Sequence, residues 1–252
     1  TPQEVATLFK TLRKLARDGC SILFISHKLE EVRSLCDQAT VLRQGRVSGH
    51  CQPKDLSASD IARLMVGDDT PISTQVSAAQ PGDTLLQVQE LSWQTDDPFG
   101  TSLKNIGFSL RAGEIVGIAG VAGNGQEELL KVLSGEITLK GEAIRFTGEA
   151  IDRLPPGARR ARGLAVVPEE RLGRGAVPVM SLADNALLTA AGQSLVRRGV
   201  IRRQRVREFA RDVISRFGVR CSGEQSSASS LSGGNLQKYI LGREACQSPR
   251  LL

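Results

Sequence analysis

The glycine-rich stretch GVAGNGQEE has the layout of a loop that binds phosphate. It lies between an apolar run, EIVGIAG, and an amphipathic run, ELLKVL, which together predict a strand, a loop and a helix. In such loops backbone N–H groups and the helix N-terminus hold the phosphates, a lysine neutralises them, and a Ser or Thr hydroxyl ligates magnesium. Here Gly120, Gly123 and Gly125 keep the backbone path, but Gln126 replaces the lysine and Glu127 replaces the hydroxyl.

These two replacements weaken the prediction of triphosphate binding. Gln126 offers a hydrogen-bond donor without charge, and Glu127 places a carboxylate beside the phosphates. At close range a misplaced unit charge costs on the order of several kcal/mol at an effective dielectric of ~20. The stretch, Asn124 included, is therefore either a degenerate nucleotide-binding loop or a glycine turn that packs a strand against a helix. No residue in it is predicted to bind a metal.

The motif LSGGN predicts a second anion-binding site, which we call an anion seat. Ser232 stands at the N-cap position of a helix, and Gly233 and Gly234 leave backbone N–H groups open to close approach. Leu231 and Asn235 flank this seat and complete the predicted nucleotide-binding motif. The alternative is an ordinary Ser-capped helix, but two glycines in its first turn would then only weaken it. That cost argues for a functional role.

Two further residues could act on a phosphate. His27 follows the apolar run SILFIS, and a histidine at the carboxyl end of a strand lies where α/β sheets bind ligands. Its ring could donate a hydrogen bond to a terminal phosphate or to an attacking water, although a single histidine more often has a structural role. Glu169, in VVPEERLGRG, ends a predicted strand on a loop that could reach a phosphate-bound metal or water; the alternative is a surface turn.

Arginines gather in two stretches of a chain whose net charge is +6, namely RLPPGARRAR and VRRGVIRRQRVREFARDVISR. Such clusters fit an acidic partner: nucleic acid, lipid headgroups or an acidic protein surface. They equally fit a solvated helix face, because acids alternate with the arginines and no aromatic platform lies among them.

The elements that position these residues follow from periodicity and capping signals. The five cysteines form no Cys-x-x-Cys pair, which indicates reduced thiols in a cytosolic protein. No apolar run approaches the ~20 residues of a membrane helix. The first part of the chain predicts, in order, a helix over 1–19, a strand over 21–26, a helix over 27–36, a hairpin over 39–50 turning at Gln44-Gly45, and a helix over 57–67.

Residues 67–83 have no periodicity and are rich in Ser, Gln, Pro and Asp, which predicts a linker. A new α/β pattern begins after it. Its predicted strands cover residues 84–93, 103–111, 114–120, 142–146 and 164–168, and a last strand starts at PRLL. Its predicted helices cover residues 126–134, 156–161, 181–190, 202–217 and the second half of LSGGNLQKYILGREAC.

Taken together, these segments resemble the ATP-binding subunit of an ABC transporter. LSGGN resembles the ABC signature, LFISHKLEEV the switch-histidine segment, the glycine loop a Walker A motif, and VVPEE a Q-loop. The resemblance implies an α/β P-loop NTPase cassette, with a mixed sheet core and a helical signature subdomain, and a partial cassette before it. Because the histidine segment precedes the glycine loop, it implies residues 1–66 as the end of a first cassette, 67–83 as a linker, and 84–252 as a second cassette that stops before Walker B.

The stretches AGEIVGIAGVAGNGQ, VPEERLGRG and LSGGNLQK resemble the importers of simple sugars and nucleosides, with a leaning toward nucleosides. The resemblance implies ATP and Mg²⁺ as cofactors, head-to-tail pairing of cassettes, transmembrane permease subunits, a separate solute-binding protein, and a peripheral place on the cytoplasmic face of the cell membrane. It implies that His27 senses the γ-phosphate at the competent site and that the site built on Gly120 to Glu127 is degenerate.

Nucleic acid is not an expected partner of such an importer. Two other classes stay open at this stage: a soluble ABC ATPase that acts on nucleic acid or ribosomes, and a regulatory fragment that binds nucleotide without catalysis.

Overall fold

The computed structural model describes residues 2–43, 45–66 and 81–252. The chain divides into two compact units, Thr1–Ala78 and Ala79–Leu252, and each is described by itself. Most of the predicted linker, 67–80, lies outside the described residues, as does Gln44 of the predicted hairpin turn.

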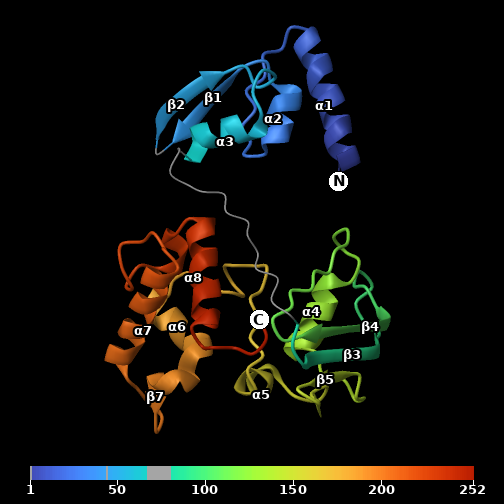
Figure 1. The fold of residues 1–252 in the computed structure, drawn as a ribbon, viewed down its shortest axis with the longest axis vertical. Coiled ribbons are helices and arrows are strands. Elements are labelled where there is room, and N and C mark those ends of the chain that lie inside the picture. Colours follow the sequence, from blue (N-terminus) through green and yellow to red (C-terminus); the bar gives the residue numbers. More distant parts are fainter. Residues whose placement is uncertain (1, 44, 67–80) are drawn as a thin grey trace. The chain divides into compact units, whose positions relative to one another are not determined.

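The first unit contains the predicted helices and hairpin (Figure 1), in the order α1 (Pro2–Arg17), α2 (Leu29–Leu35), β1 (Ala39–Arg43), β2 (Arg46–Cys51) and α3 (Ala58–Val66). Helix α3 is capped reciprocally, since Ser57 Oγ accepts from the amide of Asp60 and the Asp60 carboxylate accepts from the amide of Ser57. Ile61 of this helix is buried against the hairpin, where β2 comes close enough that a side chain at Gly49 would press on Leu64.

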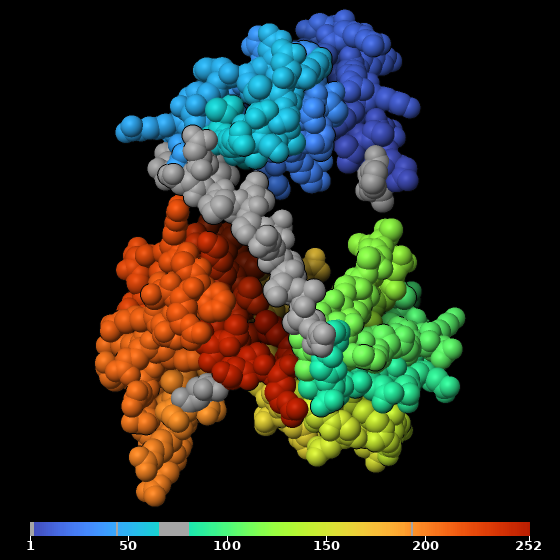
Figure 2. Space-filling model, in the orientation of Figure 1, coloured from blue at the N-terminus to red at the C-terminus, as the bar shows by residue number. Residues whose placement is uncertain are grey.

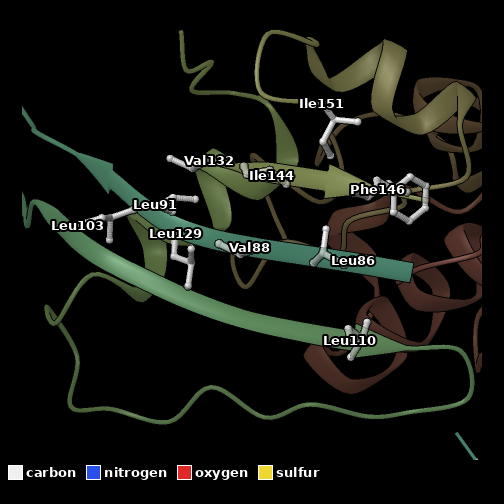
Figure 3. Packing of buried hydrophobic residues seen from close by; sticks show 11 residues of the cluster. Leu86, Val88, Leu91, Leu103, Leu110, Leu129, Val132, Ile144, Phe146 and Ile151 are labelled. Atoms are coloured by element: carbon white, nitrogen blue, oxygen red, sulfur yellow. The ribbon is translucent and has the colours of Figure 1, made fainter. Parts of the chain in front are cut away.

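The second unit begins with a four-stranded antiparallel sheet in the order β4-β3-β5-β6. The strands are β3 (Thr84–Trp93), β4 (Leu103–Arg111), β5 (Ile144–Phe146) and β6 (Glu149–Ala150). Alternate residues of β3 and β5 point to one face, where they pack with α4 (Gln126–Ser134) as Figure 3 shows. The buried cluster comprises Leu86, Val88, Leu91, Leu103, Leu110, Leu129, Val132, Ile144, Phe146, Ile151 and Leu164. This core fixes the helix that follows the glycine loop.

Helices form the rest of the second unit (Figure 1): α5 (Pro156–Ala161), α6 (Leu182–Ala190), α7 (Arg203–Arg216) and α8 (Gly233–Ala245), with a π-helical turn (Ala191–Leu195) after α6 and a 3-10 turn (Ala228–Ser230) before α8. Helices α6, α7 and α8 share two buried clusters, and the buried Tyr239 hydroxyl of α8 donates to the Leu182 carbonyl of α6 at 2.5 Å. A small hairpin of β7 (Val196–Arg197) and β8 (Val200–Ile201) was not predicted from the sequence.

Three strand predictions were wrong, those over 21–26, 114–120 and 164–168. A parallel strand depends on hydrogen bonds to a neighbouring strand, and no described segment pairs with these runs except at one parallel bridge, Leu164 to Leu251. Of the strand predicted at PRLL, only this bridge at Leu251 forms. The apolar side chains of the first two runs are consequently exposed; Leu23, Ile25 and Ile115 are 90%, 89% and 95% exposed.

The predicted α/β class is correct, because an antiparallel sheet packs against α4 and helices make up most of the rest of the second unit. Among the described residues, the strands that pair over more than one residue are all antiparallel, and the parallel pairs are two isolated bridges, Leu164 with Leu251 and Leu172 with Ala176. In the part of the chain that the structure describes, no helix combines the length and the apolar character that crossing a membrane requires.

Candidate nucleotide-binding site

The glycine loop has the backbone path of a phosphate-binding loop. Gly123 and Gly125 have φ values of 86° and 98°, which L-residues with a side chain rarely adopt. Gly125 is also the N-cap of α4, and a Cβ there would lie 3.1 Å from Leu103. Thr101 secures the loop from outside, because its Oγ1 donates to the Gly123 carbonyl at 2.7 Å. The first-turn amides of α4 therefore face the loop without a side-chain cap.

Gln126 and Glu127 decide what this loop can hold. The Gln126 side chain folds back into the loop, where its Nε2 donates to the Val121 carbonyl at 3.2 Å and closes on Gly120. Glu127 pairs with Lys131 Nζ at 2.7 Å and lies 3.7 Å from Arg174 Nη1. The hydrogen bond and charge of Lys131, with a smaller effect of Arg174, lower the pKa of the Glu127 carboxyl, so it carries a negative charge.

These residues do not fit a magnesium-bound triphosphate. An amide side chain takes up the space within the loop, and a charged carboxylate stands where a ligating hydroxyl is required. Among the described residues no group of three or more His, Cys, Asp or Glu side chains could hold a metal ion. Asn124 is exposed at the loop. The loop keeps a cradle of backbone amides but lacks the side chains that neutralise phosphate and ligate the metal.

The N-terminus of α8 is an open anion seat. Ser232 is the N-cap, yet its hydroxyl does not cap an amide of the helix; it accepts a hydrogen bond from Asn235 Nδ2 at 2.9 Å. Ser181 at the N-cap of α6 behaves in the ordinary way and accepts from the Asp184 amide at 3.0 Å. The backbone amides of Gly233 and Gly234, in the first turn of α8, are thus left for another acceptor.

The seat is rigid around Ser232. Asn235 uses its amide twice, donating to Ser232 Oγ and accepting from the Arg220 amide at 2.9 Å. Because Ser232 accepts the hydrogen bond from Asn235, its own hydroxyl hydrogen stays available for an anion. Leu231 packs against the buried cluster beneath the helix, and Gly234 has open space where a Cβ would be. The arrangement offers an anion one hydroxyl, bare amides and the positive end of a helix dipole.

Residues 168–176 contact both seats through two arginines, Arg171 and Arg174, that were not predicted from the sequence. Arg171 Nη1 would lie 2.6 Å from a Cβ at Gly233, so the glycine permits a guanidinium beside the signature helix. Arg174 binds Glu136 at 2.5 Å and approaches Glu127 of α4. Both arginines stand in the stretch ERLGRG, and their clustering beside a predicted anion loop was the signal available in the sequence.

The loop's own fold supports this placement. A Cβ at Gly175 would meet Ile240 of α8 at 2.8 Å and the Arg171 carbonyl at 2.9 Å, so only glycine lets the loop pack against that helix. Glu169 at the start of the loop is exposed, and its carboxylate has no hydrogen-bond or ion-pair partner within 81–252 or the other described ranges. Its role at a phosphate-bound metal or water stays a prediction.

His27 belongs to the first unit, whereas the other predicted site residues all belong to the second. It is exposed and precedes α2, whose start is held by Ser26 Oγ, which accepts from the Lys28 amide at 3.1 Å and lies 3.2 Å from Glu31. The backbone on either side of His27 is therefore fixed while its ring stays accessible.

Phe99 is an exposed aromatic residue that was not predicted from the sequence to be part of the site. It is 97% exposed and lies two residues before Thr101, the residue that binds the glycine loop. An exposed ring can stack on a nucleotide base. Trp93, in contrast, packs against the sheet core and is not free to do so.

The fold and the site together define a class of protein, the ATP-binding cassette. The ABC transporter family matches residues 103–252, and the chain belongs to this family. Solved cassettes share the fold: a nucleotide-free ATP-binding cassette from an ABC transporter aligns with a TM-score of 0.52 at 16% identity over 66% of each chain. A dimeric cassette in a post-hydrolysis state, bound to ADP and Pi, gives a TM-score of 0.52 at 16% identity over 66% of this chain and 71% of that one.

Among curated proteins, the chain is similar to ATP-binding proteins of importers. It is 36% identical to a nucleoside import ATP-binding protein of Lactococcus lactis subsp. cremoris, over 100% of this chain and 50% of that protein. It is 36% identical to a glucose import ATP-binding protein of Haloferax volcanii, over 100% of this chain and 46% of that one. It is 35% identical to a guanosine import ATP-binding protein of Bacillus subtilis, over 100% of this chain and 49% of that protein. The chain thus spans about half the length of these relatives.

Proposed function

We propose that the full-length protein is the ATP-binding subunit of an ABC importer and couples ATP binding and hydrolysis to the uptake of a nucleoside or a simple sugar. The relatives support this assignment, since those compared above carry names of nucleoside, guanosine and glucose import. The single structural observation that carries it is the open seat at Ser232, where a capping hydroxyl is turned away from its own helix and the first-turn amides stay bare.

In this proposal the seat at Ser232 to Gly234 binds the terminal phosphate of an ATP whose other side is held by a second cassette, paired head to tail. The Ser232 hydroxyl and the bare amides donate to phosphate oxygens, and the dipole of α8 favours their negative charge. Arg171 adds a guanidinium beside the same seat. His27 positions the γ-phosphate or the attacking water at this competent site.

The glycine loop belongs to a degenerate second site. Its filled cradle and its carboxylate support a structural contact or weak nucleotide binding rather than hydrolysis. Magnesium is assigned to the competent site alone, where the metal would neutralise phosphate charge during transfer to water. One hydrolytic site per cassette pair suffices to close and reopen the pair.

The remaining parts of the proposal concern the assembly. The full-length protein associates with transmembrane permease subunits at the cytoplasmic face of the membrane, and a separate solute-binding protein delivers the solute. The names of the import relatives support this setting. A soluble ATPase acting on nucleic acid or ribosomes is the competing class. Exposed arginines would serve it, but the names of the relatives are those of import proteins and support the importer.

A charge reversal at the seat tests the proposal in the full-length protein assembled with its permease. Ser232→Asp keeps a strong N-cap residue, so the helix is retained, but it places a carboxylate against the phosphate. Since one oxyanion donor is worth about 100-fold in rate, we expect ATP turnover and solute uptake to fall by at least about 100-fold.

Ser215→Asp is the matched control, because Ser215 is exposed on α7 between Val213 and Phe217, which lie against Gly242, nine residues along α8 from Gly233. It should leave turnover within about twofold of wild type. Unchanged turnover and uptake in Ser232→Asp would overturn the proposal. Tight, salt-dependent binding of nucleic acid by the wild-type protein, without uptake of any nucleoside or sugar, would favour the competing class.

A further inference from the structure

The hairpin β7–β8 and the first residue of α7, residues 196–203, form a surface that we call the basic hairpin. Val196 pairs with Ile201 and Arg197 pairs with Val200. The turn between them is Arg198-Gly199, with φ values of 49° and 79°, as in the type I′ turn that suits the twist of two strands. Figure 2 shows this segment as an orange projection from the rest of the second unit.

The tip residue is unusual for its backbone position. Asn, Asp and Gly are the residues that the first position of such a turn favours, because a side chain with a Cβ is strained at positive φ. Arg198 occupies that position at a conformational cost. The tip of the hairpin therefore carries a charged side chain where a smaller residue would cost less.

The charge of the basic hairpin is not neutralised by the protein itself. Arg197, Arg198, Arg202 and Arg203 are exposed, and none of them pairs with a carboxylate of the described residues. Three of the four arginines farther along α7 differ, since they form ion pairs with acids: Arg205 with Glu208, Arg211 with Glu224, and Arg216 with Asp212. The fourth, Arg207, acts on Glu224 through its charge. The acids that alternate with arginines in the sequence therefore neutralise most arginines in the later part of α7. The four arginines of the basic hairpin are left without a carboxylate partner among the described residues.

Exposed aliphatic side chains lie among these cations. Val200 is 67% exposed and Ile201 is 45% exposed, each within three residues of two or more of the free arginines. A segment that combines several free cations with exposed aliphatic groups suits the boundary of an anionic bilayer, where the cations meet headgroup phosphates and the aliphatic groups leave water. The long arginine stems can lie along the apolar region while their guanidinium groups stay with the phosphates.

We propose that the basic hairpin docks on the anionic lipid headgroups of the membrane beside the permease. The choice of lipid rests on the proposed function, which places the full-length protein at a membrane. Nucleic acid fits the surface less well, because residues 196–203 contain no aromatic side chain on which a base could stack. Two exposed aliphatic residues at the contact surface would also have no favourable place against a phosphate backbone.

Vesicle binding by the purified full-length protein tests the proposal, with ATP absent. The wild-type protein should bind vesicles of about 30% phosphatidylglycerol in phosphatidylcholine and should bind pure phosphatidylcholine at least about 10-fold more weakly. Each basic residue near an anionic surface contributes about fivefold. The variant Arg197→Ser, Arg198→Ser, Arg203→Ser should therefore lose about 100-fold in partition coefficient, and Arg→Lys at the same three positions should retain most of the binding.

The control removes three cations elsewhere: Lys104→Ser, Arg111→Ser and Lys140→Ser. Their side chains are exposed and form no ion pair with the described residues. It should change vesicle binding by less than about threefold once overall charge is allowed for. A second variant, Val200→Ser with Ile201→Ser, should weaken binding about 10-fold while preserving its salt dependence. Circular dichroism and thermal melting should match wild type for each variant, since every substituted side chain is exposed.

Several outcomes would overturn the proposal. They are equal binding to charged and neutral vesicles, an equal loss in the control variant, or tighter binding of the wild-type protein to DNA or to an acidic protein than to the charged vesicles. The proposed function can fail separately, because it is tested by ATP turnover and uptake, whereas this experiment needs neither nucleotide nor solute.

Discussion

Single residues set the difference between the two anion seats of the second unit. At Ser232 a hydroxyl is turned away from its helix by Asn235 and leaves the amides open. At the glycine loop Gln126 closes on the loop, and Glu127 is held as a carboxylate by Lys131. The backbone of both seats is suited to phosphate, so the side chains alone decide which seat can bind it. This distinction can be tested by restoring the missing groups.

The double change Gln126→Lys with Glu127→Thr should convert the loop into one that binds Mg-ATP. The lysine would supply the charge that Gln126 lacks, and the hydroxyl would offer magnesium a ligand. We expect the full-length protein to bind one more equivalent of Mg-ATP per chain, or to bind it at least about 10-fold more tightly at that site, as measured with a fluorescent ATP analogue.

Glu127→Gln is the matched control, since it removes the carboxylate charge without adding a ligand for the metal. It should change affinity much less than the double variant. Stability should hardly change in any of these variants, because the ion pair of Glu127 is exposed and water screens it. An unchanged nucleotide stoichiometry and affinity in the double variant would show that something else closes the loop.

At the scale of elements, the helix behind the glycine loop depends on one buried arginine. Arg159 of α5 is 1% exposed and donates to the carbonyls of Val132 and Leu133 at the end of α4, at 2.7 and 2.9 Å. It also donates to the carbonyls of Asp152 and Leu154, at 3.1 and 2.8 Å. Burial lowers the pKa of Arg159, and the charge of Asp152 acts in the opposite direction. One guanidinium thus satisfies carbonyls that the end of α4 leaves without partners.

Arg159→Lys should lower the free energy of unfolding by about 3 kcal/mol. A lysine has a single ammonium group and cannot reach four carbonyls at once, so buried acceptors lose their donors. Urea denaturation would measure the change. Arg162→Lys, at the exposed end of the same helix, is the control and should cost less than about 1 kcal/mol. Equal midpoints for the Arg159 variant and wild type would contradict this account of α4.

At the scale of the whole second unit, a buried carboxylate joins its helices. Glu244 of α8 is fully buried and accepts from Arg160 of α5, from Arg243 Nε at 2.8 Å, and from Thr189 Oγ1 of α6 at 2.7 Å. Three helices from different parts of the unit therefore meet at one side chain. Because Arg243 is only 2% exposed, its charge needs this partner inside the protein.

Glu244→Leu should destabilise the protein by about 3–5 kcal/mol, because it leaves the buried Arg243 without its counter-charge. Glu244→Gln keeps the shape and some of the hydrogen bonds and should cost less. Adding Arg243→Met to Glu244→Leu removes the unpaired charge and should recover part of the loss, so the two changes would be non-additive. Thermal unfolding of all three variants checks this, and strict additivity would show that the carboxylate is not the partner that Arg243 requires.

The sequence by itself determined the features that depend on neighbouring residues along the chain. Capping residues, apolar periodicity and glycine positions predicted the larger helices, both strands of the first hairpin, the long strands β3 and β4, and the two glycine motifs that identify the family. These signals are local. A helix closes its hydrogen bonds within itself, and the strands of a hairpin are marked by a turn and by alternating residues close in the sequence.

Only the tertiary structure decided the features that depend on residues far apart in the sequence. The apolar runs at 21–26 and 114–120 resemble strands, but a strand needs a neighbour to pair with, and none lies beside them in the described residues. The same holds for Arg171 beside Gly233 and for the ion pair of Arg174 with Glu127. The sequence shows which residues can donate, accept or carry charge, whereas their contacts follow from the packing that brings distant segments together.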